Sequence, residues 1–205
     1  MNPLLQLEEH RQAVWLDFVE RDFIADGGLK RLVEQDGLKG VTSNPSIFDK
    51  AIGKGGSYDD SLNAALGVTD VDVTSLYERM AIEDIRAAAD VLRPVYVQNA
   101  GHDGFVSLEV SPYLAMDTEA TIAEARRLWI AVQRPNLMVK VPGTQAGLPA
   151  IRQLVGEGIN INITLLFAQD VYEAVAEAYL AGLEQFAARG GDLRGVSSVA
   201  SFFVS

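Results

Sequence analysis

Apolar and polar residues follow two different periods in alternating segments of this chain. Short apolar runs predict strands, and they cover Ala13–Phe18, Leu38–Asn44, Phe105–Ser111, Leu137–Pro142, Ile159–Leu166 and Val196–Val204. Between them, apolar residues repeat at roughly helical spacing, as in Leu76, Met80, Ile85, Ala88 and Leu92, in Ile122, Ala125, Trp129 and Val132, in Leu148, Ile151 and Leu154, and in Val171, Val175, Ala178, Gly182 and Phe186. Strands that alternate with helices in this way predict βαβ units and a parallel sheet.

Local signals predict where some helices begin and end. Asp117 or Thr118 is expected to cap the N-terminus of one helix, because both side chains can accept a hydrogen bond from free backbone N–H groups. The pair Gly190–Gly191 is expected to end the last helix. A further helix is expected over Asn2–Gln12, and the glycine-rich segment Lys50–Ser61 is expected to be a mobile excursion before another helical stretch.

Polar side chains gather on one face of each predicted strand, because successive side chains point to opposite faces. In Ile159–Leu166 the odd positions are all branched and apolar, whereas the even positions begin with Asn160, Asn162 and Thr164. Lys140 lies on the corresponding face of its own strand. Most of the other strands alternate in the same way and present Asp17, Ser107, Glu109, Ser111, Ser197 and Ser201. The second strand is less regular, but Thr42 and Asn44 share a parity near its end.

This alternation separates two parallel architectures. In an open doubly wound sheet, the central strands are covered by helices on both faces and are nearly all apolar. In a barrel, one face of each strand meets helices and the other points inside, with the chemistry at the carboxyl ends of the strands. A half-solvated antiparallel sheet also alternates, but it does not need a helix between every pair of strands. We therefore predict an α/β fold of the (β/α)8 TIM-barrel type, with about six of the eight βα units in this chain.

The composition excludes several classes of function. The 205 residues include no cysteine, which excludes disulfides, thiolate zinc sites and a cysteine nucleophile, and two histidines are too few for a histidine-rich metal cluster. A net charge of −11 argues against general nucleic-acid binding. No apolar run reaches the roughly 18 residues of a membrane span. The first residues lack the layout of a signal peptide, so we expect a cytoplasmic protein.

Lys140 is the most informative polar residue, because lysine is almost never buried without a partner and this one lies within Leu-Met-Val-Lys-Val-Pro. The alternative is that its side chain extends to solvent at an edge strand. An amine must be neutral to attack a carbonyl; burial lowers the pKa of an amine, and nearby carboxylates raise it. The resulting carbinolamine loses water to give an iminium, which accepts the electrons of a neighbouring carbon–carbon bond as that bond breaks. This chemistry requires no metal and no organic cofactor.

Other polar residues can serve the proton transfers and the substrate. Glu109 and Thr164 can manage an acid/base step through a nearby water, and Asp17 can accept a proton from the hydroxyl whose carbon–carbon bond breaks. Asn44 and Asn162 can hydrogen-bond substrate hydroxyls or the carbinolamine. Simpler alternatives exist, since a lone carboxylate at a strand end is more often a cap or an ion-pair partner, and an asparagine can merely satisfy local backbone groups.

Together these segments resemble transaldolase, a family that forms a Schiff base with its substrate. The resemblance is carried by four segments, Gly40–Ser46, Ser107–Val110, Leu137–Thr144 and Asn160–Phe167, while Trp15–Asp17 and Ser201–Phe203 agree in place and character. The Trp-Leu-Asp-Phe form and the long segment Lys50–Ser61 are similar to the larger bacterial transaldolases, some of which are fused to a sugar-phosphate isomerase.

The resemblance implies a role for each matched position. Lys140 resembles the Schiff-base lysine, Asp17 the general base for carbon–carbon cleavage, and Glu109 with Thr164 the pair that manages the catalytic water. The implied substrate-binding residues are Thr42, Asn44, Asn162, Ser201 and Phe203. The implied reaction belongs to the pentose phosphate pathway and moves a dihydroxyacetone unit from sedoheptulose 7-phosphate to glyceraldehyde 3-phosphate, giving erythrose 4-phosphate and fructose 6-phosphate.

The resemblance also sets expectations for the rest of the protein. Residues 1–205 are expected to form one barrel domain that lacks its C-terminal part, because the family has about eight strands and grips phosphate with arginines after the sixth. The expected partners are sugar-phosphate substrates, with no nucleic acid and no membrane, and with a homodimer or a fused C-terminal module left open. Two alternatives remain: a Schiff-base sugar-phosphate aldolase of the same superfamily, and a catalytically inert barrel fragment that needs its missing C-terminal part.

Overall fold

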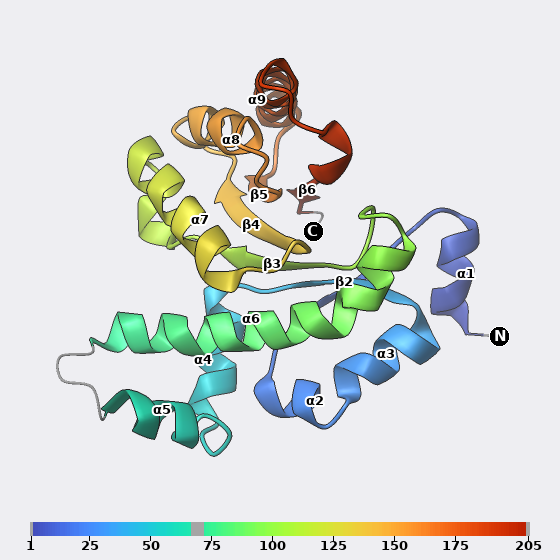
Figure 1. Ribbon diagram of the computed structural model, residues 1–205, viewed down its shortest axis with the longest axis vertical. Helices are drawn as coiled ribbons and strands as arrows, with labels where there is room; N and C mark the ends of the chain where they lie inside the picture. Colours follow the sequence, from blue (N-terminus) through green and yellow to red (C-terminus); the bar gives the residue numbers. More distant parts are fainter. Residues whose placement is uncertain (1, 67–71, 204–205) are drawn as a thin grey trace. The chain divides into compact units, whose positions relative to one another are not determined.

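A computed structural model gives the fold of this chain and describes residues 2–66 and 72–203 (Figure 1). The chain divides into two compact units, residues 1–106 and residues 107–205. The boundary falls inside strand β3 (Phe105–Glu109), so this strand contributes residues to both units. Of the strand predicted over Val196–Val204, the last residue lies outside the described residues.

The first unit contains the first two strands and helices α1 to α6. Its elements are α1 (Pro3–Glu9), β1 (Val14–Asp17), α2 (Arg21–Ala25), α3 (Gly28–Asp36), β2 (Leu38–Thr42), α4 (Pro45–Gly53), α5 (Asp59–Leu66), α6 (Val73–Gln98) and the start of β3. β1 and β2 are parallel, and their register places Asp17 opposite Thr42. β2 and β3 are also parallel, with Gly40 opposite Phe105. Helices α3 and α6 contact β2 and each other, so they cover one face of these strands.

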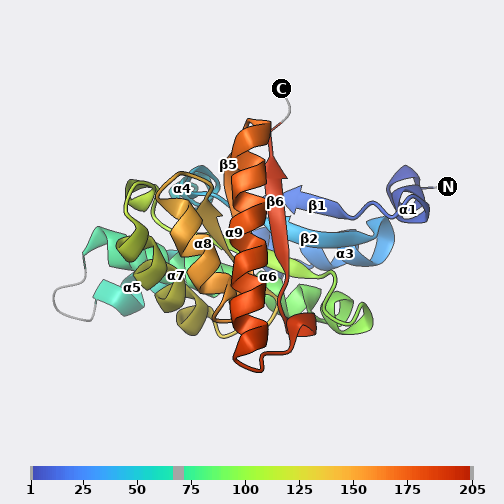
Figure 2. The same ribbon diagram turned by 90° about the horizontal axis from the view of Figure 1, so that it is seen from above.

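The second unit holds the remaining strands. Its elements are the end of β3, η1 (Pro112–Leu114), α7 (Thr118–Val132), β4 (Leu137–Pro142), α8 (Gly147–Val155), β5 (Ile161–Leu166), α9 (Gln169–Ala188), η2 (Leu193–Gly195) and β6 (Ser198–Phe202). β4 and β5 are parallel, as are β5 and β6. Helices α7, α8 and α9 follow one another along the same side of β4 and β5, and α9 runs beside β6 (Figures 1 and 2).

The order of the strands confirms the predicted fold class. Neighbouring strands follow one another in chain order, β1 to β6, with helices in between. A doubly wound sheet reverses its strand order at a switch point, whereas a (β/α) barrel adds each strand next to the preceding one. The described part of the chain is therefore a partial (β/α)8 barrel with six strands. None of the helices described, α6 and α9 included, is both long and apolar enough to cross a membrane.

Helix ends follow the local signals in the sequence. Asp117 caps α7, and its side chain accepts a hydrogen bond of 3.0 Å from the backbone N–H of Ala120, as predicted. Gly190, at φ +83°, follows the end of α9, and its N–H donates to the carbonyl of Ala187 over 2.9 Å. Asn44 caps α4 in the same manner as Asp117 caps α7. Asp117 and Asn44 thus fix the points at which α7 and α4 begin, and Gly190 marks the point at which the chain leaves α9.

The segment predicted to be a mobile excursion is largely helical, so that prediction was wrong. Lys50 lies within α4, and α5 begins at Asp59, so only Lys54–Tyr58 separates the two helices. Tyr58 is 3% exposed, which shows that this connection is anchored rather than loose. The glycines of the segment suggested flexibility, but they only shape a short turn. Helices α2 and α3 were not predicted individually; α2 has only five residues, too few to establish a helical period.

The core of the second unit lies between its helices and the apolar face of its strands. Ile151 and Leu154 of α8 are completely buried, as are Val139, Val141 and Ile161 of β4 and β5, and α8 contacts both strands. The apolar alternation predicted for β4 and β5 therefore faces the helices. The opposite face of these strands holds the polar residues.

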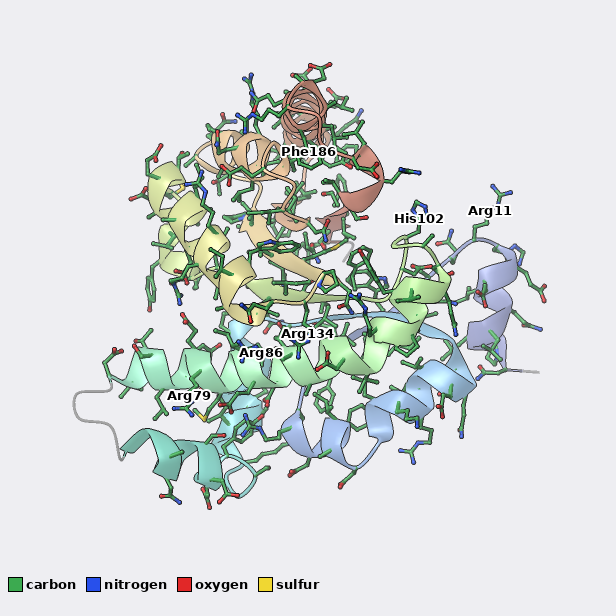
Figure 3. All side chains as sticks on the ribbon, in the orientation of Figure 1. Arg11, Arg79, Arg86, His102, Arg134 and Phe186 are labelled. Atoms are coloured by element: carbon green, nitrogen blue, oxygen red, sulfur yellow. The ribbon has the colours of Figure 1, made fainter. Side chains whose placement is uncertain are left out.

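Phe186 of α9, labelled in Figure 3, packs closely against two glycines of the second unit. A Cβ atom at Gly158 would lie 2.8 Å from the Phe186 ring, and one at Gly191 would lie 2.5 Å from it. Gly158 also has φ +81°, a conformation that side chains rarely adopt. The aromatic ring thus occupies space that only glycine leaves, which fixes α9 over the end of α8.

Glu157 links α7 to the end of α8 and gives a pH-dependent test of this packing. It accepts a hydrogen bond of 2.8 Å from Arg126 Nε and one of 2.6 Å from Gln153 Nε2. The hydrogen bond from Arg126 holds the pKa of Glu157 below its ordinary value. A lowered pKa in the folded state contributes stability above the unfolded-state pKa, and this contribution is lost as pH falls through the folded-state value.

We therefore expect Glu157→Gln to lower the free energy of unfolding by about 0.5–1 kcal/mol at neutral pH, because the ion pair is partly exposed. Urea denaturation should show this difference shrinking between about pH 5 and about pH 3. The control is Glu177→Gln, which changes an exposed glutamate of α9 in the same unit. An equal loss at every pH would contradict the assigned cause.

Candidate active site

A buried lysine lies on the polar face of β4. Lys140 is 8% exposed, and its Nζ lies 3.2 Å from Oε2 of Glu109 at the end of β3. The backbone N–H of Val110 donates to the carbonyl of Lys140 over 3.2 Å, while Asn162 of β5 lies opposite Lys140 in the register. The lysine therefore does not extend to solvent at an edge strand. A charged pair in this position has lost most of its water and depends on close contact for compensation.

A chain of hydrogen bonds crosses the same face of β3, β5 and β6. Asn162 Nδ2 donates to Ser107 Oγ over 3.1 Å, and Ser201 Oγ donates to Asn162 Oδ1 over 2.7 Å. Asn162 is 1% exposed, so the amide is held firmly between two serines. Its second N–H is a donor that can serve a ligand. Ser107 lies on the predicted polar face but was not predicted as a site residue, and no signal other than its parity could have singled it out.

Thr164 ends the row of polar residues on β5. It is 4% exposed, and its Oγ1 is buried with no hydrogen-bond partner among the residues that the structure describes. Its carbonyl accepts a hydrogen bond of 2.8 Å from the backbone N–H of Gly143, which ties the end of β5 to the end of β4. A buried hydroxyl without a partner costs about 1–3 kcal/mol, so its retention points to a role outside the packing of the chain.

The alternation predicted for β5 is wrong at its last apolar position. Leu165 was expected to share the helix-facing side with Ile163, but it is 44% exposed and has φ +63°. The register with β6 shifts between Ile163 and Leu166, and Leu166 is fully buried instead. An extra residue in one strand produces such a β-bulge. The bulge makes Thr164 the last residue of β5 to follow the regular alternation.

Asn160 has a structural role, which was one of the alternatives open for the asparagines. Its Nδ2 donates to the carbonyl groups of Pro135 and Leu137 over 3.1 and 3.2 Å. Its Oδ1 accepts a hydrogen bond of 2.9 Å from the backbone N–H of Ser197. The side chain thus replaces missing backbone partners at the start of β5 and is fully occupied there.

Two aromatic rings stand at the ends of β5 and β6. Phe203 is 56% exposed, and its ring stacks on that of Phe167 with 5.1 Å between centroids and an interplanar angle of 20°. The backbone N–H of Phe203 donates to the carbonyl of Leu166 over 3.2 Å, so this residue continues beside β5 after β6 ends. Phe167 was not predicted as a site residue, although an aromatic residue directly after a strand is a usable signal.

The first unit brings together the other predicted site residues. Asp17 is exposed at the end of β1, and Thr42 lies opposite it at the end of β2. Asn44 follows two residues later, and its Oδ1 accepts a hydrogen bond of 3.0 Å from the backbone N–H of Ile47 at the start of α4. This cap leaves the Nδ2 group as the part of Asn44 that can reach a ligand.

The fold and these side chains define a class of protein, a (β/α) barrel with a buried lysine paired with a glutamate at its strand ends. Residues 14–205 match the family model described as Transaldolase/Fructose-6-phosphate aldolase. The chain therefore belongs to the transaldolase/fructose-6-phosphate aldolase family.

Curated relatives agree with this assignment over the whole chain. "Transaldolase 2" of Nostoc punctiforme is 48% identical over 204 residues, which are 100% of this chain and 53% of the relative. "Transaldolase" of Parafrankia sp. is 52% identical over 203 residues, covering 99% of this chain and 55% of the relative. "Transaldolase" of Thermobifida fusca is 52% identical over 204 residues, covering 100% and 55%. The chain thus spans about half the length of the curated relatives it matches.

Proposed function

We propose that this chain carries the catalytic residues of a transaldolase that works through a Schiff base on Lys140. The proposed reaction transfers a dihydroxyacetone unit from sedoheptulose 7-phosphate to glyceraldehyde 3-phosphate. The observation that carries the proposal is the buried Lys140 paired with the half-buried Glu109, with 3.2 Å between Nζ and Oε2. The family and the names of the relatives support the choice of reaction.

The lysine and the glutamate together can form the imine. Glu109 accepts a proton from the ammonium group, and the neutral amine adds to the ketone carbon of the sugar. The carbinolamine formed in this way loses its hydroxyl as water, with a proton returned by Glu109, and becomes an iminium. Thr164 Oγ1, buried and without a protein partner among the described residues, is suited to bind the water that leaves and later returns.

Cleavage then uses the iminium as an electron sink. The bond between C3 and C4 breaks, its electron pair forms an enamine on the lysine adduct, and Asp17 accepts the proton of the C4 hydroxyl. The aldehyde product leaves, and the enamine attacks the aldehyde carbon of the acceptor while Asp17 returns the proton. Water finally hydrolyses the new iminium and releases the ketose product.

The remaining predicted residues are proposed to hold the sugar. Asn44 Nδ2, the Thr42 hydroxyl and the second N–H of Asn162 are donors suited to hydroxyl groups, while Ser201 and Phe203 would line the channel. The relatives are nearly twice as long as the match. The reaction would belong to the pentose phosphate pathway in the cytoplasm and would need no cofactor.

The deciding experiment incubates the protein with fructose 6-phosphate in the presence and absence of erythrose 4-phosphate. We expect glyceraldehyde 3-phosphate and sedoheptulose 7-phosphate to form only when the acceptor is present. Release of free dihydroxyacetone without an acceptor would favour an aldolase instead. A protein that neither turns over nor forms a borohydride-trapped adduct would contradict the proposal.

Asp17→Ala separates the two halves of this mechanism. We expect carbon–carbon cleavage to slow by about 10²–10⁴-fold, because the general base is lost, while imine formation continues. Single-turnover release of glyceraldehyde 3-phosphate measures the first step, and the mass of the borohydride-reduced adduct measures the second. Asp26→Ala, at an exposed position beyond α2, is the control. Loss of the adduct before loss of cleavage would contradict the role given to Asp17.

A further inference from the structure

An arginine at the start of the helix that follows β1 joins three helices of the first unit. Arg21 is the first residue of α2, and its Nε donates to Asp84 Oδ1 over 2.7 Å. Its Nη2 lies 3.0 Å from Glu83 Oε2, and its Nη1 donates to Ser61 Oγ over 2.6 Å. Glu83 and Asp84 belong to α6, and Ser61 belongs to α5. One guanidinium therefore binds side chains from two other helices.

Tyr58 completes this group on the side of the protein interior. Its hydroxyl donates to Asp84 Oδ2 over 2.7 Å, and the Arg21 guanidinium carbon lies 4.4 Å from the centre of its ring. Asp84 is 2% exposed, so both of its oxygens are satisfied inside the protein. We call Arg21, Tyr58, Ser61, Glu83 and Asp84 the Arg21 clamp.

The cost of this arrangement argues against stability as its purpose. Burial raises the pKa of Asp84 above its ordinary value, although the hydrogen bonds from Tyr58 and Arg21 act in the opposite direction. Buried ion pairs of this kind are often replaced by apolar residues without loss of stability. Apolar contacts have no preferred direction, whereas these hydrogen bonds fix the orientation of the chain where it enters α2.

The clamp holds the two connections that carry the proposed first-unit site. Only three residues separate Asp17 at the end of β1 from Arg21. The connection after β2, which begins with the Asn44 cap of α4, leads to Tyr58 and Ser61 on the other side of the clamp. A hydrogen bond of 2.7 Å from Ser57 Oγ to Asp22 Oδ2 and an ion pair between Lys54 and Glu20 join the same two connections.

Glu83 forms an ion pair with a second arginine besides Arg21. Arg79, labelled in Figure 3, lies one turn earlier on α6, and its Nε is 3.2 Å from Glu83 Oε1. The acceptor for Arg21 is therefore oriented from its own helix. Helices α2 and α5 are thus both joined to α6, the longest helix of the described chain.

We infer that Arg21 is a positioning residue that sets the place of the Asp17 carboxylate relative to Thr42 and Asn44. This inference rests on the proposed function, because it assumes that Asp17 receives the hydroxyl proton. A misplacement of about 1 Å at a reacting group costs on the order of 10²-fold in rate. Loosening the clamp should therefore slow carbon–carbon cleavage, while the lysine of the second unit still forms its imine.

The experiment compares three variants with the unaltered chain. Arg21→Lys keeps the charge but loses the forked contacts to α5 and α6. The triple variant Arg21→Met, Tyr58→Phe and Asp84→Leu removes the clamp without leaving an unpaired buried charge, so it is expected to fold. Arg31→Met changes an exposed arginine of α3 and serves as the control.

Two readouts decide the outcome. Single-turnover cleavage of fructose 6-phosphate should fall about tenfold in Arg21→Lys and about 10²-fold in the triple variant, with an unchanged yield of borohydride-trapped adduct. Amide hydrogen exchange at residues 18–20 should become about tenfold faster in both, and neither quantity should change in Arg31→Met. Unchanged cleavage and unchanged exchange in the folded triple variant would overturn the inference.

The same measurements separate this inference from the proposed function. If the unaltered chain forms no adduct, the proposed function fails on that result alone. Hydrogen exchange at residues 18–20 then still reports whether the clamp fixes the connection after Asp17. Unchanged exchange in the triple variant would overturn the inference about Arg21. Loss of the adduct together with cleavage in a folded variant would also contradict a positioning role confined to Asp17.

Discussion

Lys140→Arg is expected to abolish covalent trapping of a ketose phosphate by borohydride and to reduce dihydroxyacetone transfer by about 10³-fold or more. The guanidinium group stays protonated and cannot attack a carbonyl carbon, so no imine forms. It keeps a positive charge beside Glu109, which avoids leaving that half-buried carboxylate without a cation. Intact-mass measurement after reduction gives the result directly, as the presence or absence of one substrate-sized addition.

The control for this prediction is Lys50→Arg, at an exposed position of α4. It should retain both the adduct and the rate of transfer. A trapped adduct of undiminished yield in Lys140→Arg would assign the chemistry to another lysine and remove the basis of the proposed function. Circular dichroism of both variants checks that the fold is kept.

Gly147→Ala is expected to destabilise the second unit by about 3 kcal/mol. Gly147 begins α8, and a Cβ atom there would lie 1.9 Å from the carbonyl oxygen of Pro142, the last residue of β4. It would also lie 3.3 Å from Thr144 Oγ1, which accepts a hydrogen bond of 3.0 Å from the Gly147 N–H. The Pro142 carbonyl belongs to the backbone and cannot move by itself, and Thr144 Oγ1 is held by its hydrogen bond to Gly147. The new methyl group must therefore displace the end of the strand that carries Lys140.

Gly53→Ala is the matched control, because a Cβ atom at this last residue of α4 would meet nothing within 4 Å. Helix propensity predicts a gain of up to about 1 kcal/mol there. Urea unfolding of the two variants gives the comparison. A loss below about 1 kcal/mol in Gly147→Ala would show that the turn after β4 is more adaptable than this close approach implies.

The features that could be predicted from the sequence are those that follow from the periodic spacing of apolar and polar residues along the chain. The bounds of β4 agree with the predicted run Leu137–Pro142, and Lys140 lies beside Glu109 because parallel strands bring equivalent ends together. The parity of Asn162 and Thr164 on β5 was predicted correctly for the same reason. Alternation is a strong signal because a shift of one residue would exchange the two faces of the strand.

The features that could not be predicted depend on contacts distant in sequence or on backbone conformations with no compositional signature. The bulge at Leu165 breaks the alternation without a glycine or a proline to announce it. Tyr58 lies close to glycines, and its burial depends on partners distant in sequence, Asp84 and Met80 of α6. The sharing of Asn162 between Ser107 and Ser201 likewise requires three strands to be placed before it can be recognised.

The Asn44 cap has a consequence for selectivity. A backbone N–H can only donate, so the Ile47 N–H fixes which end of the Asn44 amide is oxygen, and the amide cannot rotate by half a turn without losing the start of α4. The group turned away from the helix is therefore always NH₂. A ligand that contacts this side chain must therefore offer a hydrogen-bond acceptor. A ligand that offers a donor at this position is disfavoured, because the start of α4 fixes the orientation of the amide.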